Sequence, residues 1–300
     1  MMVFALFVFL SICLRLRYRI KVKGLDKVYA KGNKGILFLP NHPALIDPVI
    51  MNIVLFWKFH VRSLVHDKQV HTTALKYFSK SLRLLELPSL GVVGKAGVDA
   101  VRQQIENCSA ALKQGDNILM YPAGRIYRGR FEKLRGNGGV AKIIEDDPDV
   151  RIVLVRTRGL WGSSFSRARG YQENFMTTLK SHIKHVLLNL IFFGPRREVE
   201  IEFMDLPEDF PKFGDKETIN RSLEEFYNED APSNTYVPYY WWNGAARARS
   251  RSRRHTPPPR TRRMSPKMSG RRCMPSCMRF RPTRRCRTPI PWGPTWGWTA

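Results

Sequence analysis

The stretch that decides the fold is residues 35–48, GILFLPNHPALIDP. Residues 36–39 are an apolar run with the length of a buried strand, and Pro40 ends it. Asp47 and the proline after it have the form of a helix start, with Asp at the N-cap and Pro at the first helical position, and the apolar segment 49–59 follows. The sequence therefore predicts a strand, a short turn and a helix.

His42 and Asp47 share this turn. A carboxylate placed there can accept the imidazole N–H, which fixes the tautomer and leaves the other ring nitrogen as a general base. A lone His in a turn and an Asp before Pro are also common structural features. The pair is therefore a candidate catalytic dyad whose assignment depends on the other motifs.

A second motif, YPAGR at residues 121–125, follows another short apolar strand, 117–120. Open α/β sheets place ligand-binding loops at the ends of their strands. Gly124 lets the backbone come close to a ligand, and Arg125 offers a fork of donors suited to a phosphate. A third buried strand, 151–156, leads into the loop 157–165.

These motifs together resemble the glycerolipid acyltransferase superfamily. Its first signature, Asn-His-x-x-x-x-Asp, is matched by Asn41, His42 and Asp47. The combination of YPAGRIYR with VRTRGLWGSSF resembles most the acyltransferase half of the bifunctional 2-acylglycerophosphoethanolamine acyltransferase/acyl-[acyl-carrier-protein] synthetase family. The resemblance covers roughly residues 14–243.

The resemblance implies an α/β fold, with one acyltransferase domain at residues 15–243 whose central mixed sheet is flanked by helices. It also implies catalysis by His42 as general base, with Asp47 holding the imidazole. The residues implied to bind substrate are Asn41, Lys95, Gly124, Arg125 and Arg128. Ala123 stands where the superfamily has Glu, and Glu132 is a candidate to replace that carboxylate.

The implied reaction moves a fatty acyl group from a thioester of acyl-carrier protein or coenzyme A to a free hydroxyl of a lysophospholipid or glycerol phosphate. No cofactor is expected besides this co-substrate. No metal is expected, because His60, His66 and His71 do not share one helical face. The five cysteines form no CxxC pair, which indicates a reducing compartment.

The formal net charge of +26 is unevenly distributed. Residues 244–300 hold 16 Lys plus Arg and no acidic residue, so residues 1–243 carry +10. With 43% hydrophobic residues in 300, the chain can bury one sizeable core. Residues 1–243 are therefore moderately basic, and residues 244–300, the tail, are strongly basic.

Residues 1–14 are almost wholly apolar and, as a helix, about 21 Å long, against a hydrocarbon core of ~30 Å. Basic residues follow at once, which is typical of an anchor that meets an anionic cytoplasmic leaflet. We expect a membrane anchor and contact with membrane phospholipid; a buried N-terminal helix is the alternative. Residues 14–22 alternate as a half-buried strand with a cationic outer face.

Residues 244–300 contain no Leu or Val and nine prolines, so we expect a disordered tail. This Arg-, Pro-, Cys- and Trp-rich composition is what a GC-rich coding region yields out of frame. We therefore interpret the tail as a frameshift product. The alternative is a native basic tail that binds anionic lipid or nucleic acid, but no nucleic-acid recognition motif is present, so no specific nucleic-acid partner is expected.

The remaining periodic segments alternate between helices and strands, which favours an α/β fold. The apolar segment 183–193 fits a buried helix, a strand or a contact with lipid. The expected helices are 99–114, 138–145 and 215–228, and the expected strands are 61–65 and 198–204. A rival to the enzyme is a membrane protein of the same fold that binds lysophospholipid without turning it over, which Ala123 suggests.

Overall fold

The structure is a computed structural model that describes residues 2–66, 84–87, 95–168, 170, 175–188, 190, 196–231, 235–236 and 248–249. All of them lie in the compact unit Met1–Arg253. His71 lies outside the described residues. So does the predicted tail, apart from β9 (Ala248–Arg249), which pairs with β8 (Thr235–Tyr236).

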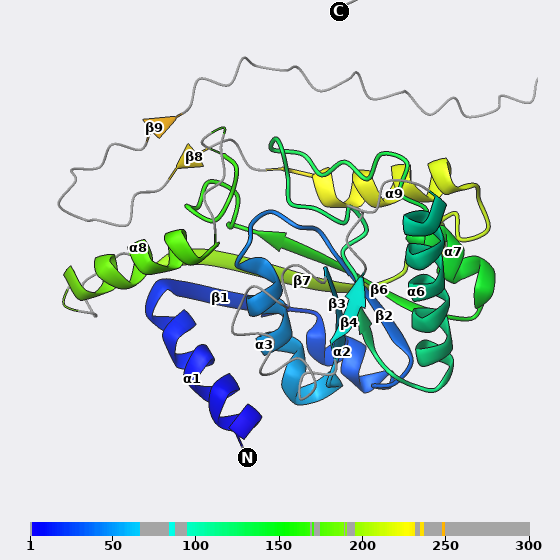
Figure 1. The fold of residues 1–300 in the computed structure, drawn as a ribbon, viewed down its shortest axis with the longest axis horizontal. Coiled ribbons are helices and arrows are strands. Elements are labelled where there is room, and N and C mark those ends of the chain that lie inside the picture. The colour runs from blue at the N-terminus through cyan, green and yellow to red at the C-terminus, as the bar shows by residue number, and fades with distance from the viewer. Residues whose placement is uncertain are drawn as a thin grey trace, which may run out of the picture. The chain divides into compact units, whose positions relative to one another are not determined.

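The described residues form one sheet of seven strands (Figure 1). In spatial order these are β1 (Tyr18–Lys23), β7 (Arg197–Asp205), β6 (Arg151–Arg158), β2 (Ile36–Pro40), β5 (Ile118–Leu119), β3 (Arg62–His66) and β4 (Leu85–Leu87). All neighbours are parallel except β6 and β7, which are antiparallel. The predicted mixed sheet is therefore confirmed.

Helices cover both faces of this sheet, so the central strands are apolar on both sides. Ile36 and Phe38 of β2 face a core shared with three helices: α1 (Met2–Arg17), α2 (Leu25–Ala30) and α3 (Asp47–Phe59). Leu37 and Leu39 face a second core, shared with α6 (Lys95–Lys113), α7 (Gly139–Asp146) and α9 (Lys216–Asn228). One further described helix is α8 (Phe175–Leu188).

The predicted strand 14–22 is wrong in its first part, because α1 continues to Arg17 and β1 begins at Tyr18. Phe7 and Leu14, two helical turns apart, are both buried, and the Phe7 ring stacks on Phe56 of α3 with centroids 3.9 Å apart. Packing on α3 therefore holds this segment helical. Helix α2 was not predicted from the sequence; it follows Gly24, which adopts a left-handed conformation (φ 79°).

The predicted cationic face of β1 is partly neutralised by its neighbour in the sheet. Lys21 forms an ion pair with Glu198, and Lys23 forms one with Glu200, at 2.7 Å. Both glutamates lie on β7. Of the helices in the described part of the chain, none combines the length and the apolar character needed to cross a bilayer.

Strands β2, β5 and β6 are mutually parallel, so their carboxyl ends lie at the same edge of the sheet. The residues that follow these ends are 41–48, 121–138 and 159–168. The first two sequence motifs fall in the first two segments, and the third motif, residues 155–165, begins in β6 and ends in the third segment.

Candidate active site

The turn after β2 brings His42 and Asp47 together. The His42 Nδ1 lies 3.6 Å from the Asp47 Oδ2, and the Asp47 side chain is fully buried while that of His42 is 14% exposed. This separation is an ion-pair distance and longer than a hydrogen bond. Because Nδ1 faces the carboxyl group, the other ring nitrogen, Nε2, is the one left for a substrate.

Asp47 does not cap α3, contrary to the sequence-based prediction. The N-cap is Ile46, no side chain caps the helix, and Asp47 is its first residue. The carboxyl group lies toward His42 instead, and neither of its oxygens makes a hydrogen bond. Burial raises the pKa of Asp47 above its usual value, and the neighbouring His42 opposes that rise.

Two further side chains enclose this pair. The Tyr121 ring lies against the imidazole of His42, with centroids 4.3 Å apart. Burial, followed by the negative charge of Asp47, raises the pKa of Tyr121 well above its usual value, so its hydroxyl stays protonated. Thr157 lies close enough to lower the pKa of Asp47, and its hydroxyl is buried.

Asn41 joins the ends of two strands. Its Oδ1 accepts the N–H of Thr157 at 2.7 Å, and its Nδ2 donates to the Thr157 carbonyl at 3.0 Å and to the Tyr127 hydroxyl at 2.6 Å. Both amide hydrogens are thus used inside the protein. Asn41, predicted to bind substrate, holds the end of β2 against the end of β6.

Glu132 supports the backbone of His42. It is 2% exposed, and its Oε2 accepts the N–H of His42 at 2.8 Å. Burial raises its pKa to about 8, opposed by that hydrogen bond and reinforced by the charge of Asp47. The sequence suggested Glu132 as a replacement for the carboxylate missing at Ala123, and in the structure its side chain holds the backbone of His42.

The YPAGR motif forms a turn beside His42. Gly124 adopts a left-handed conformation (φ 61°), and its N–H donates to the Tyr121 carbonyl at 2.9 Å. Ala123 is buried, at 4% exposure. The Asn137 side chain fixes the turn by donating to the Pro122 carbonyl at 2.9 Å.

Of the predicted phosphate-binding residues, Arg125 and Arg128 are less buried than this cluster, and Arg125 lies close enough to Glu132 for their charges to interact. Arg125 is partly exposed and Arg128 is exposed, and neither forms an ion pair within the described ranges. Desolvation, then the nearby charges of Arg135 and Arg128, lower the pKa of Arg125. Lys95 is the first residue of α6, and its side chain lies outside the described residues.

Two arginines that the sequence analysis did not single out line a pocket with Thr157. Arg130 and Arg158 line an open pocket together with Asn41, Tyr127, Thr157 and Tyr227. The sequence did not distinguish Arg130 from the other basic residues of its loop. Arg158 was read as part of an exit loop, whereas β6 continues to this residue and carries it to the edge of the sheet.

Other reactive groups lie away from this cluster. Cys108 is buried in α6, and burial raises the pKa of its thiol to about 11, so the thiol is protonated at neutral pH. Cys13 is exposed and unpaired. Within the described residues, no group of three or more His, Cys, Asp or Glu side chains could hold a metal ion.

Comparison with known proteins bears on what this edge of the sheet does. Residues 19–156 match the model of the Acyltransferase family. The matched region includes His42, Asp47 and Glu132. No curated protein matches the chain.

One similar solved structure is the 1-acyl-sn-glycerophosphate (LPA) acyltransferase PlsC from Thermotoga maritima. It is 15% identical in sequence, with a TM-score of 0.44, and the similarity covers 71% of this chain and 71% of that one.

Proposed function

We propose that this protein is an acyltransferase that moves a fatty acyl group from a thioester to the free hydroxyl of a lysophospholipid or glycerol phosphate. The observation that carries the proposal is the buried contact of 3.6 Å between His42 and Asp47 at the ligand-binding edge of the sheet. This contact lies inside the region that matches the Acyltransferase family.

In the proposed reaction, Nε2 of His42 takes the proton of the acceptor hydroxyl. The hydroxyl oxygen forms a bond to the thioester carbonyl carbon, and the carbon–sulfur bond then breaks. The leaving thiolate takes the proton back from the imidazolium. Asp47 stabilises the imidazolium while it exists, and burial makes that ion pair stronger than it would be in water.

The donor in this proposal is acyl-carrier protein or acyl-coenzyme A. The net charge of +10 on residues 1–243 complements an acidic protein or a phosphorylated cofactor. Arg125, Arg128 and Lys95 remain sequence-based candidates for the substrate phosphate. The more specific resemblance, to the bifunctional enzyme that acylates 2-acylglycerophosphoethanolamine, is likewise part of the proposal.

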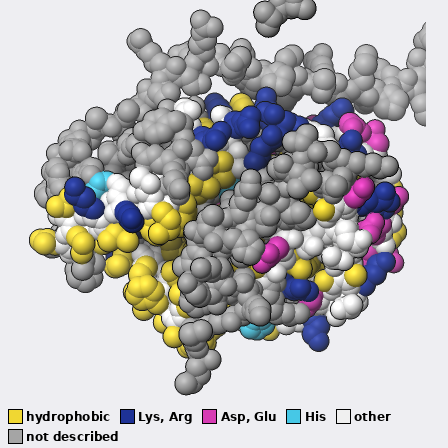
Figure 2. Space-filling model, viewed as in Figure 1, with side chains coloured by type: hydrophobic (Ala, Val, Ile, Leu, Met, Phe, Trp, Pro, Cys, Tyr) yellow, Lys and Arg dark blue, Asp and Glu magenta, His cyan; other side chains and the backbone are white. Residues whose placement is uncertain are grey.

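We further propose that the enzyme works at the cytoplasmic face of a membrane. Phe9 and Ile12 of α1 are 62% and 56% exposed, although both are large and apolar. Figure 2 shows hydrophobic side chains gathered over α1 and α8. A lipid surface would remove this apolar area from water.

The experiment compares wild type with His42→Ala and Asp47→Asn, using labelled acyl donors and a panel of lysophospholipids and glycerol 3-phosphate. General-base catalysis contributes ~10²- to 10⁴-fold, so His42→Ala is expected to lower kcat by at least 100-fold. Melting temperatures of all three proteins control for folding. A His42→Ala enzyme with near-wild-type kcat would contradict the mechanism.

The second candidate function is lysophospholipid binding without turnover, which the buried Ala123 favours because the superfamily has a carboxylate there. The same assay separates the two functions. Wild-type protein that binds lysophospholipid in vesicles and transfers no acyl group from any donor would establish the binding protein. Turnover by wild type that His42→Ala abolishes would establish the enzyme.

A further inference from the structure

The pocket that contains Arg130 and Arg158 adjoins the candidate dyad. It forms where the ends of β2 and β6, the loop after β5 and the C-terminal end of α9 meet. Thr157 connects the pocket with the dyad. It lines the pocket, and it also lowers the pKa of Asp47. A ligand in the pocket would therefore lie beside the groups that carry the proposed chemistry.

Both arginines are held by backbone carbonyls rather than by ion pairs, although the charge of Arg158 also acts on the carboxylates of Glu200 and Glu229 and lowers their pKa values. One terminal nitrogen of Arg130, Nη2, donates to the Ala231 carbonyl at 3.0 Å, and Nη2 of Arg158 donates to the Glu229 carbonyl at 2.7 Å. The Nε of each arginine is buried and makes no hydrogen bond. The carbonyl contacts hold both side chains in place, and each guanidinium keeps one terminal nitrogen, Nη1, for which the described residues show no hydrogen bond.

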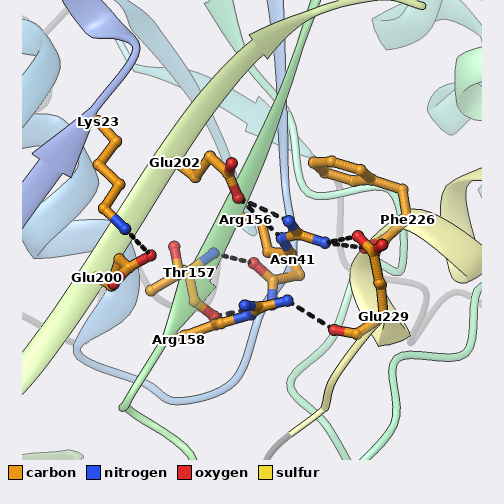
Figure 3. A network of polar contacts seen from close by, with 9 residues as sticks. All are labelled: Lys23, Asn41, Arg156, Thr157, Arg158, Glu200, Glu202, Phe226 and Glu229. Carbon is orange, nitrogen blue, oxygen red and sulfur yellow. Dashed lines mark hydrogen bonds and ion pairs between the residues drawn. The ribbon is translucent and has the colours of Figure 1, made fainter.

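Arg156, on the same strand as Arg158, differs in that its charge is neutralised by ion pairs (Figure 3). It is paired with Glu202 at 2.7 Å and with Glu229 at 2.5 Å. Arg130 and Arg158 form no such ion pair in the described part of the chain, and none of the residues that line the pocket is acidic. Figure 2 shows a group of Lys and Arg side chains on this face of the molecule.

We propose that Arg130 and Arg158 together bind a phosphate group in this pocket, and that in the acyl-transfer reaction it is the phosphate of the acyl acceptor. The guanidinium group suits a phosphate, which can accept from the terminal nitrogens that the carbonyl contacts leave free. The second half of this proposal rests on the proposed function. The first half, phosphate binding, stands without it.

This assignment differs from the one based on resemblance, which gives the phosphate to Arg125. Arg125 does not line the pocket. The two assignments therefore predict that different variants lose phosphate binding. The resemblance predicts a loss on substitution of Arg125, and the pocket predicts a loss on substitution of Arg130 or Arg158.

The test measures binding of glycerol 3-phosphate, inorganic phosphate and uncharged glycerol to the full chain by isothermal titration calorimetry. Arg130→Gln and Arg158→Gln are each expected to weaken glycerol 3-phosphate binding at least tenfold, and Arg158→Lys less than that. Glycerol is expected not to bind. Lys133→Gln removes an exposed charge from the same loop as Arg130 and is expected to change the affinity less than twofold.

Wild-type affinity in both Gln variants would overturn the pocket assignment. So would an equal loss in Lys133→Gln, or a tenfold loss confined to Arg125→Gln. Melting temperatures of the unliganded variants show whether a loss of binding reflects unfolding. If Arg158→Gln fails to fold, Arg130→Gln and Arg158→Lys carry the test.

Turnover distinguishes the two sources of phosphate. A rise in the KM for glycerol 3-phosphate, with the KM for acyl-coenzyme A unchanged, supports the acceptor site; a rise confined to the coenzyme A thioester overturns it. Phosphate binding that depends on both arginines, in a protein with no acyl transfer, would keep the phosphate site and reject the proposed function.

Discussion

Glu132 shares its buried surroundings with a second carboxyl group, Asp47, whose charge acts on it. The other groups that face it are the Glu224 carboxylate, the amides of His42 and Lys133, the Arg125 guanidinium and the hydroxyls of Tyr127 and Tyr227. Because burial dominates, the folded protein holds Glu132 protonated up to a pKa of about 8, against 4.5 for an ordinary glutamate.

This shift predicts how stability changes with pH. Between pH 4.5 and 8 the folded state binds a proton at Glu132 that the unfolded state has released, so the free energy of unfolding falls as pH rises through this window. The decrease due to Glu132 amounts to at most about 5 kcal/mol. Glu132→Gln should flatten this part of the profile, which denaturant unfolding between pH 5 and 9 would measure. Identical slopes in wild type and Glu132→Gln would contradict the prediction.

Glu132 should also act on the reaction as a positioning residue for His42. Glu132→Gln keeps an oxygen that can accept the His42 N–H, and Glu132→Leu removes it. We expect Gln to retain most of kcat and Leu to lose about tenfold, with the KM for the donor unchanged. If Glu132→Gln lost as much activity as Glu132→Leu, the carboxyl group itself would be required.

At the scale of elements, α9 holds the loop that carries Glu132. The Oδ1 of Asn228 accepts the N–H of Glu132 at 2.7 Å, and its Nδ2 donates to the Glu132 carbonyl at 2.9 Å. The Glu224 carboxylate accepts the N–H of Leu134 at 2.6 Å. A helix formed by residues 216–228 therefore positions a loop about 90 residues earlier in the chain.

We predict that Asn228→Ala lowers the free energy of unfolding by about 2 kcal/mol, because two backbone groups of Glu132 lose their partner. It should also lower kcat, since the loop that supports His42 is loosened. The matched control is Arg221→Ala, an exposed substitution on the same helix. Thermal unfolding and initial rates measure the two effects. Equal stability of Asn228→Ala and Arg221→Ala would show that the two hydrogen bonds between Asn228 and Glu132 contribute little.

The sequence predicted most of the elements around the site and the closeness of His42 and Asp47, because apolar runs and turn residues are local signals. It failed where long-range packing decides. The Asp47 carboxyl group lies toward an imidazole rather than capping its own helix, and Leu14 to Arg17 remain helical because α1 packs on α3. Arg130 and Arg158 come from segments 28 positions apart, and only the folded sheet brings them to one pocket.

At the scale of the whole molecule, the structure refines how the membrane proposal should be tested. Removing residues 1–14 would uncover α3, because Phe7 packs on Phe56. Replacing the exposed Phe9 and Ile12 by Ser leaves this contact in place. We predict that the double variant sediments with anionic lipid vesicles at least fivefold less than wild type does.

The control for this prediction replaces two other exposed residues of α1, Ala5 and Cys13, by Ser. This change adds the same number of hydroxyls and removes little apolar area. Equal sedimentation of the two double variants would contradict a lipid contact through Phe9 and Ile12.

The pairing of β1 with β7 also has a kinetic consequence. β1 is the first strand of the chain, yet its hydrogen-bonding neighbour is the last strand of the large sheet, and Lys23 and Glu200 are 177 positions apart. During synthesis, β1 has no partner strand until β7 has been made. Contacts between residues so distant in sequence also slow folding. A chain halted before Arg197 would therefore leave this strand without its partner, and an unpaired strand edge is a template for aggregation.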